Sequence, residues 1–253
     1  MTRAGAISGA VGSPGVSPWS SEKDVYFDAS NLGRAAKTRT VAWIDLMGAR
    51  NHMKASLARA ANHVGRLHAA ALEERSTYVS VYPVIDGFYA VSDESRSVRD
   101  YVQRVFRRLA CHFMKANTVH RCFYRCGVAR GKLLLGADLL QGTLAMQYNP
   151  RYSAGIAIGE AIVLAYEAET KAAPYGVCTD PSVDAPFQNA ANVMANNWWK
   201  WWNPNDANHV ARIVGLRTEI DAYLAQAVAG SLPVPYSQGR AQQHRGEASQ
   251  YFQ

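Results

Sequence analysis

The sequence predicts an α+β domain in which an antiparallel sheet carries helices on one face. This prediction rests on three observations. Short β-rich runs alternate with long stretches of helical periodicity, an Asp-Gly pair joins two of the β-rich runs, and 48% of the residues are apolar. At roughly 100–200 residues per domain, a chain of 253 residues allows one domain with appendages.

The first predicted strand covers residues 38–45, an apolar run that ends in Asp45. A long helix is expected over residues 50–74, because apolar residues recur there at steps of three and four and form one stripe. The stripe consists of Met53, Leu57, Ala60, Val64, Leu67 and Ala71.

Residues 78–85 and 88–91 are β-rich and flank Asp86-Gly87, so they predict a hairpin. A second helix is expected from Ser95 onward, with a capped and acidic start. Its apolar face contains Val98, Val102, Val105, Phe106, Leu109 and Phe113.

The remaining elements complete a single ferredoxin-like unit. Residues 121–130 predict a strand, 131–140 a turn with a short strand or loop, 159–171 a helix, and 175–179 a last short strand. The order β-α-β-β-α-β, followed by α-β, is that of a ferredoxin-like unit.

The two ends of the chain differ from this middle part. Residues 1–37 are rich in Gly, Ser, Ala and Pro and predict a flexible N-terminal arm. The domain proper is expected over 38–180. Residues 181–253 predict a helical C-terminal extension with a loose polar tail from residue 233. Four Trp within 198–202 cannot share one helical face, so we expect them to pack on the core or on a partner subunit, with a partner protein or membrane surface as the alternative.

Composition restricts the function. Lys and Arg number 27 against 20 Asp and Glu, a net charge of +7 that suits a nucleotide, a nucleic acid or an anionic membrane. No apolar run is long enough to span a membrane, and no signal-like segment opens the chain. Four Cys are too few for a disulfide scaffold, so a cytoplasmic protein with reduced thiols is expected.

Asp45 and Asp86 are the candidate catalytic residues. In a β-α-β-β unit the first and third strands are neighbours, so the two carboxylates are expected to converge. Carboxylates held this close repel one another unless a cation lies between them, and Mg²⁺ or Mn²⁺ prefers such oxygen ligands. The alternative is that Asp86 only forms a turn and Asp45 only begins a helix.

Four segments together resemble class III nucleotide cyclases. Residues 44–48 read Ile-Asp-Leu-Met-Gly, and 84–91 read Val-Ile-Asp-Gly-Phe-Tyr-Ala-Val, similar to the two metal motifs of that family. Residues 125–131 with Gly136, and the helix at 159–165, are similar to the segments that follow. The resemblance spans residues 38–179 and implies a cyclase homology domain.

The resemblance also implies a mechanism and a partner. Asp45 and Asp86 would bind two Mn²⁺ or Mg²⁺ ions, with the backbone carbonyl of Leu46 as a further ligand. The ribose 3′-hydroxyl of a nucleoside triphosphate would attack the α-phosphorus and release pyrophosphate. Family sites form between two subunits, so a homodimer is implied. The phosphates would be bound by the amides of Met47, Gly48 and Ala49, with a contact from Arg50.

Three positions depart from the family pattern. Tyr82 occupies the position of the usual base-reading Lys, while Val163 and Glu167 replace the usual Asn and Arg. A bulky, neutral Tyr82 favours a smaller base, and the chain resembles the bacterial Pycsar cyclases, which make cyclic UMP or cyclic CMP as antiphage signals. UTP is the favoured substrate and CTP the alternative. We expect Arg130, with Arg125 or Lys132 as alternatives, to supply the missing positive charge.

Two other functions remain open. The lost Asn and Arg suit a degenerate, non-catalytic cyclase-like domain for dimerisation or ligand binding. The positive charge suits nucleic-acid binding, but the aromatic strand signature of RNA-binding domains is missing, so neither a nucleic-acid nor a membrane partner is expected.

Overall fold

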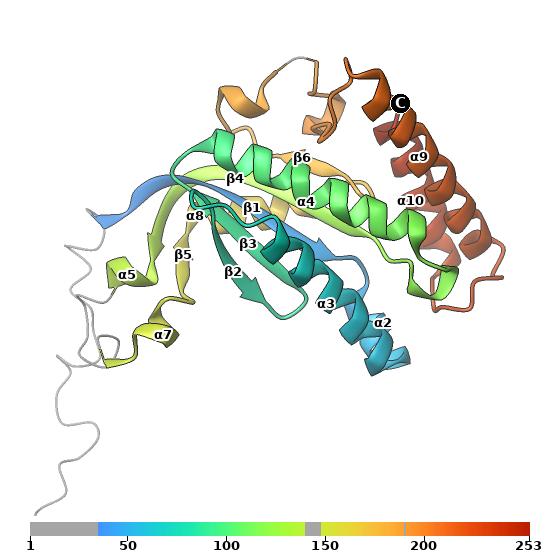
Figure 1. Cartoon of the computed structure of the whole chain (residues 1–253), viewed down its shortest axis with the longest axis horizontal. Helices are drawn as coiled ribbons and strands as arrows, with labels where there is room; N and C mark the ends of the chain where they lie inside the picture. Colours follow the sequence, from blue (N-terminus) through green and yellow to red (C-terminus); the bar gives the residue numbers. More distant parts are fainter. Residues whose placement is uncertain (1–34, 140–147, 190) are drawn as a thin grey trace, which may run out of the picture.

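The computed structural model describes residues 35–139, 148–189 and 191–253. The predicted α+β class is confirmed: a six-stranded sheet has the order β2-β3-β1-β4-β5, and β6 pairs with β4 (Figure 1). All pairs are antiparallel except β4 with β6. The strands are β1 (Lys37–Leu46), β2 (Ser80–Val84), β3 (Gly87–Ser92), β4 (Tyr124–Leu135), β5 (Ala157–Gly159) and β6 (Val177–Thr179).

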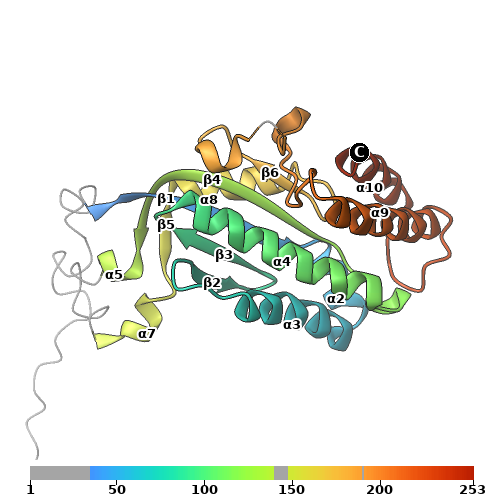
Figure 2. The ribbon, with the colours of Figure 1, turned by 45° about the horizontal axis from the view of Figure 1, so that its top comes forward.

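The helices pack on both faces of this sheet, whereas one face was expected (Figures 1 and 2). Ala42 and Ile44 of β1 belong to the main core under α3 and α4, while Val41 and Trp43 pack with residues of α8 on the opposite face. The longer helices are α2 (Ala49–Ala55), α3 (Leu57–Glu73), α4 (Ser95–Lys115), α8 (Glu160–Glu169), α9 (Ala207–Val228) and α10 (Gln238–Tyr251), and the short ones are α5 (Gly136–Leu139) and α7 (Pro150–Ser153).

Gly127 explains how close α8 lies to the sheet. A Cβ atom at this position of β4 would lie 1.9 Å from the Ala165 carbonyl oxygen and 2.2 Å from the Glu169 nitrogen. Only a residue without a side chain fits there, so Gly127 sets the distance between β4 and the end of α8.

The long first helix is divided at Ser56. This residue is extended (φ −164°, ψ 109°), and its hydroxyl caps α3 by accepting a hydrogen bond from Arg59 N at 3.3 Å. The break changes the direction of the predicted stripe: Met53 and Leu57 are exposed, while Ala60, Leu67 and Ala71 are buried as predicted. The apolar face predicted for α4 is buried in full.

The strand predicted to end at residue 130 continues to Leu135. It continues because the start of β1 also pairs with it, with Lys37 opposite Leu133. The turn expected from residue 131 therefore begins only at α5. The hairpin at Asp86-Gly87 forms as predicted.

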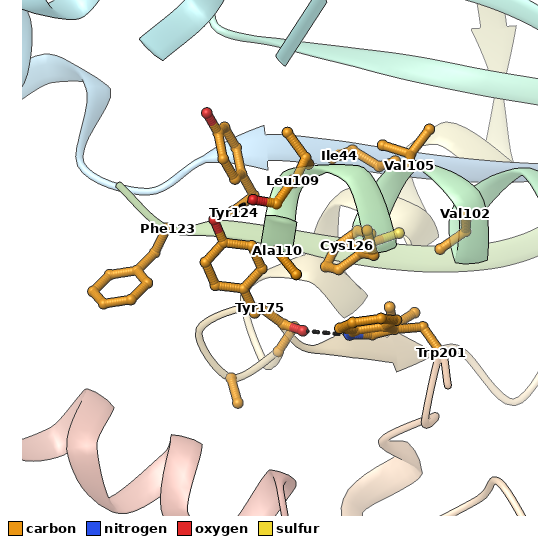
Figure 3. Packing of buried hydrophobic residues seen from close by; sticks show 14 of the residues in the cluster. Ile44, Val102, Val105, Leu109, Ala110, Phe123, Tyr124, Cys126, Tyr175 and Trp201 are labelled. Atoms are coloured by element: carbon orange, nitrogen blue, oxygen red, sulfur yellow. Dashed lines mark hydrogen bonds between the residues drawn. The ribbon is translucent and has the colours of Figure 1, made fainter. Parts of the chain in front are cut away.

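The four Trp of the run at 198–202 are buried in the core of this chain, each at most 6% exposed. They follow irregular backbone, with φ +64° at Asn196 and +59° at Asn197, so their rings need not share one face. Trp201 Nε1 donates to the Tyr175 carbonyl at 2.8 Å (Figure 3).

The tail predicted to be loose instead contains the helix α10, which packs along α9 (Figure 1). Tyr251 is fully buried; its hydroxyl donates to the Trp199 carbonyl at 2.6 Å and accepts from Val177 N at 3.2 Å. The pattern at 187–230 is helical mainly over α9. The predicted N-terminal arm lies outside the described residues except for 35–37. None of the described helices is long and apolar enough to cross a membrane.

Candidate active site

Asp45 and Asp86 lie beside each other at one end of the sheet. Asp45 pairs with Gly87 across β1 and β3, and Leu46 N donates to the Asp86 carbonyl at 3.3 Å. The hairpin turn is thus held against the end of β1, as predicted from the strand order.

The electrostatics of this pair are unusual. Burial, followed by the charges of Glu169 and Asp86, raises the pKa of Asp45 to about 7, although Arg125 and the Leu46 N–H act in the opposite direction. A carboxyl group with this pKa is only partly ionised near neutral pH. A divalent cation between the acids would offset the repulsion and favour the ionised form.

Glu169 is a third acid of the site, and the sequence analysis missed it. It ends α8 and is buried; burial raises its pKa, and Arg125 lowers it. Arg125 Nε lies 2.7 Å from Glu169 Oε1 in an ion pair. The signal in the sequence is helical phase, because Glu169 falls on the buried stripe of α8 with Ala161, Ala165 and Ala168, whereas Glu167 and Val163 are exposed.

Arg125, rather than Arg130, lies beside the two acids. Arg125 lies opposite Asp45 in the pairing of β1 with β4, while Arg130 lies opposite Thr40, five positions or roughly 17 Å further along. Arg130 Nη1 donates to Thr40 Oγ1 at 3.0 Å and to Ser95 Oγ at 3.3 Å. The expectation for Arg130 is therefore corrected: it joins the sheet to the start of α4.

The turn after β1 presents two free amides. Gly48 has φ +73°, a left-handed conformation that suits glycine. The Met47 N–H donates to the Phe123 carbonyl at 2.9 Å, so it does not reach a phosphate, which corrects the expected set. Neither the Gly48 nor the Ala49 N–H donates to any other described residue. Arg50 is exposed and has no partner among the described residues.

A cavity of about 80 Å³ opens beside this turn. Gly48, His52 and Arg125 line one side of it, and no Asp or Glu belongs to its lining. His52 is 8% exposed, and its Nδ1 atom is buried without a hydrogen-bond partner. The opposite wall comes from the segment leading into α10 and includes Ser237, Arg240 and His244.

This cavity is electropositive for a specific reason. Arg240 has no ion pair with a described residue, so its charge is uncompensated there. Burial, Arg125 and Arg240 together lower the pKa of His244 to about 4. An anion in the cavity would meet Arg125, Arg240 and the Gly48 turn. The sequence analysis did not include the C-terminal contribution, because the tail was expected to be loose.

An aromatic row lies on the face that also carries Asp45. Tyr82 pairs with Tyr89, and Tyr89 pairs with Trp43, two residues before Asp45. The rings of Trp43 and Tyr89 have centroids 4.4 Å apart. Trp43 is 5% exposed, and its Nε1 is buried without a partner. Tyr82 is half-buried, and burial raises its pKa.

The donor set suits a hard divalent cation. In the described part of the chain, no three His, Cys, Asp or Glu side chains surround one point as a complete metal site. Mg²⁺ usually takes one or two carboxylates together with substrate phosphates and water. Asp45, Asp86 and the Leu46 carbonyl fit this smaller set. The raised pKa of Asp45 indicates that neighbouring groups do not fully stabilise its ionised form, which a bound cation would do.

Comparisons with known proteins give weak likenesses. No family model matches the chain, and no curated protein does. An adenylate/guanylate cyclase/hydrolase from Silicibacter pomeroyi is similar in structure, at 15% identity and a TM-score of 0.44, over 65% of this chain and 96% of that chain. Two structures of a bacterial light-regulated adenylyl cyclase give TM-scores of 0.48 and 0.47 at 12% and 10% identity.

These likenesses do not decide the family, because every TM-score is below 0.5. The chain covers 47% and 58% of the two light-regulated cyclases, while they match 63% and 73% of this chain. The case for a function therefore depends on the residues themselves. Asp45, Leu46, Gly48, Ala49 and Asp86 lie together at one end of the sheet, and Arg130 lies apart.

Proposed function

We propose that this chain is a nucleotide cyclase that acts on a ribonucleoside triphosphate. The observation that carries the proposal is the placement of Asp45 and Asp86 on adjacent strand ends, next to a carboxylate-free cavity lined by Arg125 and Arg240. This arrangement suits a nucleoside triphosphate that binds together with metal ions, because the acids would bind the ions and the cationic cavity would bind the phosphates. The products are a 3′,5′-cyclic nucleotide and pyrophosphate.

The metal ligands in this proposal are Asp45, Asp86 and the Leu46 carbonyl, which hold two Mg²⁺ or Mn²⁺ ions. When bound, the ions supply a lowered pKa for the 3′-hydroxyl and neutralise charge on the phosphates. The chemistry of the donor set supports this assignment.

The chain's own groups position the substrate. The Gly48 and Ala49 amides donate to phosphate oxygens, and Arg125 and Arg240 bind the pyrophosphate end from opposite walls of the cavity. Arg50 approaches the phosphates from the solvent side. Most of the rate enhancement then comes from in-line orientation and charge stabilisation rather than from side-chain proton transfer.

The base is a pyrimidine in this proposal, with UTP favoured and CTP as the alternative. Tyr82 and Tyr89, both half-buried, lie side by side on the face of Asp45, and their rings take a base by stacking, while Trp43 is buried behind Tyr89. A Tyr in place of a Lys at position 82 also disfavours a purine, since it narrows the space.

Turnover of each nucleotide tests the proposal directly. Purified protein is incubated with ATP, GTP, CTP or UTP and Mn²⁺, and cyclic product and pyrophosphate are quantified. We expect cyclic UMP from UTP, and none from Asp45→Asn or Asp86→Asn. Cyclic AMP or cyclic GMP alone would overturn the pyrimidine assignment, and no product from any nucleotide would overturn catalysis.

A homodimer completes the site in this proposal. Val163 and Tyr166 of α8 are large apolar side chains that are more than half exposed, and α8 packs on the face of the sheet that carries Asp45. A second copy covering them would bury this apolar surface. We place the reaction in the cytoplasm, supported by four cysteines that form no disulfide, and we assign the product a signalling role in antiphage defence.

The second candidate function is a non-catalytic, ligand-binding domain. It is favoured by Val163 and Glu167, which are exposed and replace the Asn and Arg of active relatives. It predicts UTP binding by calorimetry with no product. The turnover assay separates the two candidates.

A further inference from the structure

A second cavity lies between α4 and α9 and shares no lining residue with the cavity at the Gly48 turn. Its volume is about 240 Å³. The walls are largely apolar, and the Trp run supplies part of the lining. The apolar lining residues are Ala110 and Met114 of α4, Ile213 and Leu216 of α9, and Trp201 and Trp202.

Three of the six remaining lining residues are cationic. Arg107, Lys115 and Arg212 line the cavity, and none of them forms a hydrogen bond or an ion pair with a described residue. No Asp or Glu belongs to the lining. Asp206, the nearby acid, lies 3.7 Å from His209 and caps α9 through its backbone amides. Asp206 offsets part of the charge of Arg212 from outside the lining, and three cationic side chains without an acid remain in the lining itself. The cavity therefore combines an apolar interior with an excess of positive charge, and that combination is complementary to an anion with an apolar tail.

Gly215 contributes to the lining from the middle of α9. Glycine is unfavourable inside a helix, and here its missing side chain leaves space beside Met114. A Cβ atom at Gly215 would meet only Met114 Cε, at 3.8 Å, which is ordinary contact. A larger side chain would thus fill the cavity without forcing the backbone to move.

We propose that this cavity binds a single-chain amphiphilic carboxylate, a medium-chain fatty acid, with its carboxylate between Arg107 and Arg212. Water occupies about 30 Å³ per molecule, so the volume takes about eight groups of methylene size. One acyl chain of about eight carbons fits, whereas a two-chain lipid or a peptide helix does not. This inference does not depend on the cyclase proposal. It gives a role to the basic face of α4 and to the Trp run.

Calorimetric titration with octanoate tests the charge and the size. We expect one saturable site for octanoate and none for octylamine, which has the same tail with a positive head group. Hexanoate, shorter by two methylene groups, should bind about 15-fold more weakly, since each buried methylene contributes about fourfold.

Two variants test the location. Gly215→Leu should abolish octanoate binding, while Gly65→Leu, at a helical glycine of α3 with open space around it, should leave binding unchanged. The double variant Arg107→Glu/Arg212→Glu should lose octanoate and gain octylamine. A gain of binding cannot arise from misfolding.

Several results would overturn the proposal. The first is that octanoate does not bind. The second is that octylamine binds the unmodified chain as tightly as octanoate does. The third is that octanoate still binds to Gly215→Leu. Concentration-dependent self-association that Gly215→Leu abolishes, with octanoate having no effect, would assign this face to a second copy instead.

Discussion

Asp45 is the residue on which the proposed chemistry of this chain depends most. Its carboxyl group is half-buried, faces two other carboxylates, and is offset by one arginine. When ionised, such a group lowers the free energy of unfolding, but it can serve as a ligand when a cation is bound. Arg125 and Arg130 lie on the same strand, five positions apart. Arg125 lies opposite Asp45, whereas Arg130 lies opposite Thr40.

The raised pKa of Asp45 predicts a pH-dependent stability. Because its pKa is about 7 in the folded chain and 3.8 in the unfolded chain, the folded state holds its proton more tightly. The contribution of Asp45 to the free energy of unfolding should therefore fall as the pH rises from about 4 to 7, by on the order of 2 kcal/mol after solvent screening, whereas the lowered pKa values of His63 and His244 act in the opposite direction over this range. Urea unfolding across this range measures the slope.

The matched control for the pH effect is Asp45→Asn. The difference in the free energy of unfolding between the unmodified chain and this variant should fall between pH 4 and 7, because the histidines and Glu169 titrate in both proteins and Asp45 in only one. Mn²⁺ at pH 8 should raise the unfolding midpoint of the unmodified chain and not that of the variant. An unchanged slope in Asp45→Asn would show that another group is responsible.

Arg125→Ala should destabilise the chain by about 3 kcal/mol, because it leaves Glu169 buried without its cation. Arg125→Ala/Glu169→Gln should recover most of that stability but no turnover. The comparison is Arg130→Ala, which loses hydrogen bonds to Thr40 and Ser95 and should cost about 1–2 kcal/mol with activity retained. Equal activity in the two single variants would contradict the assignment.

At the scale of elements, α8 and α10 decide the shape of the site. The close approach of α8 to β4 brings Glu169 to Asp45, and the segment before α10 closes the cavity at the Gly48 turn. Both elements lie far from Asp45 in the sequence. Their positions follow from packing, through Gly127 in one case and Tyr251 in the other.

Gly127→Ala should unfold or severely destabilise the chain, by about 3 kcal/mol or more, because the new methyl group would collide with backbone atoms of α8. Gly65→Ala should instead stabilise it by about 0.5–1 kcal/mol, since nothing lies near that position in α3. Thermal unfolding of the two variants measures both effects. A mild effect at Gly127 would mean that α8 can shift away.

Arg240→Ala should raise KM for the nucleotide about tenfold, with little loss of stability, because the Arg240 side chain has no partner among the described residues. The control on the same helix is Arg245→Ala, which breaks a surface ion pair with Asp221 and should leave KM unchanged. Steady-state kinetics compare the two. Parallel changes in KM would exclude a specific role for Arg240.

At the scale of the whole molecule, one sheet separates two different environments. The face under α3 and α4 forms the large core, while the face with α8 carries the acids, the aromatic row and exposed apolar side chains. The second face has the character of a surface that a further copy covers. The α4–α9 cavity lies elsewhere, between α4 of the domain and the C-terminal extension.

Val163→Asp should convert the proposed dimer to a monomer and abolish turnover, because it places a charge within an apolar contact. Val210→Asp, at an exposed apolar residue of α9, is the control and should change neither property. Sedimentation velocity reports the assembly. Full activity in monomeric Val163→Asp would show that one chain is sufficient.

The sequence by itself determined the sheet order around β1, the hairpin at Asp86, the buried face of α4 and the convergence of the two aspartates. These follow from local periodicity and strand adjacency, which neighbouring residues encode. Only the tertiary structure decided that α8 covers the second face, that Arg125 rather than Arg130 lies beside the two acids, that Glu169 joins them, and that α10 closes the cavity. Those features depend on contacts between residues far apart in the chain, and the spacing of residue types along the sequence does not indicate such contacts.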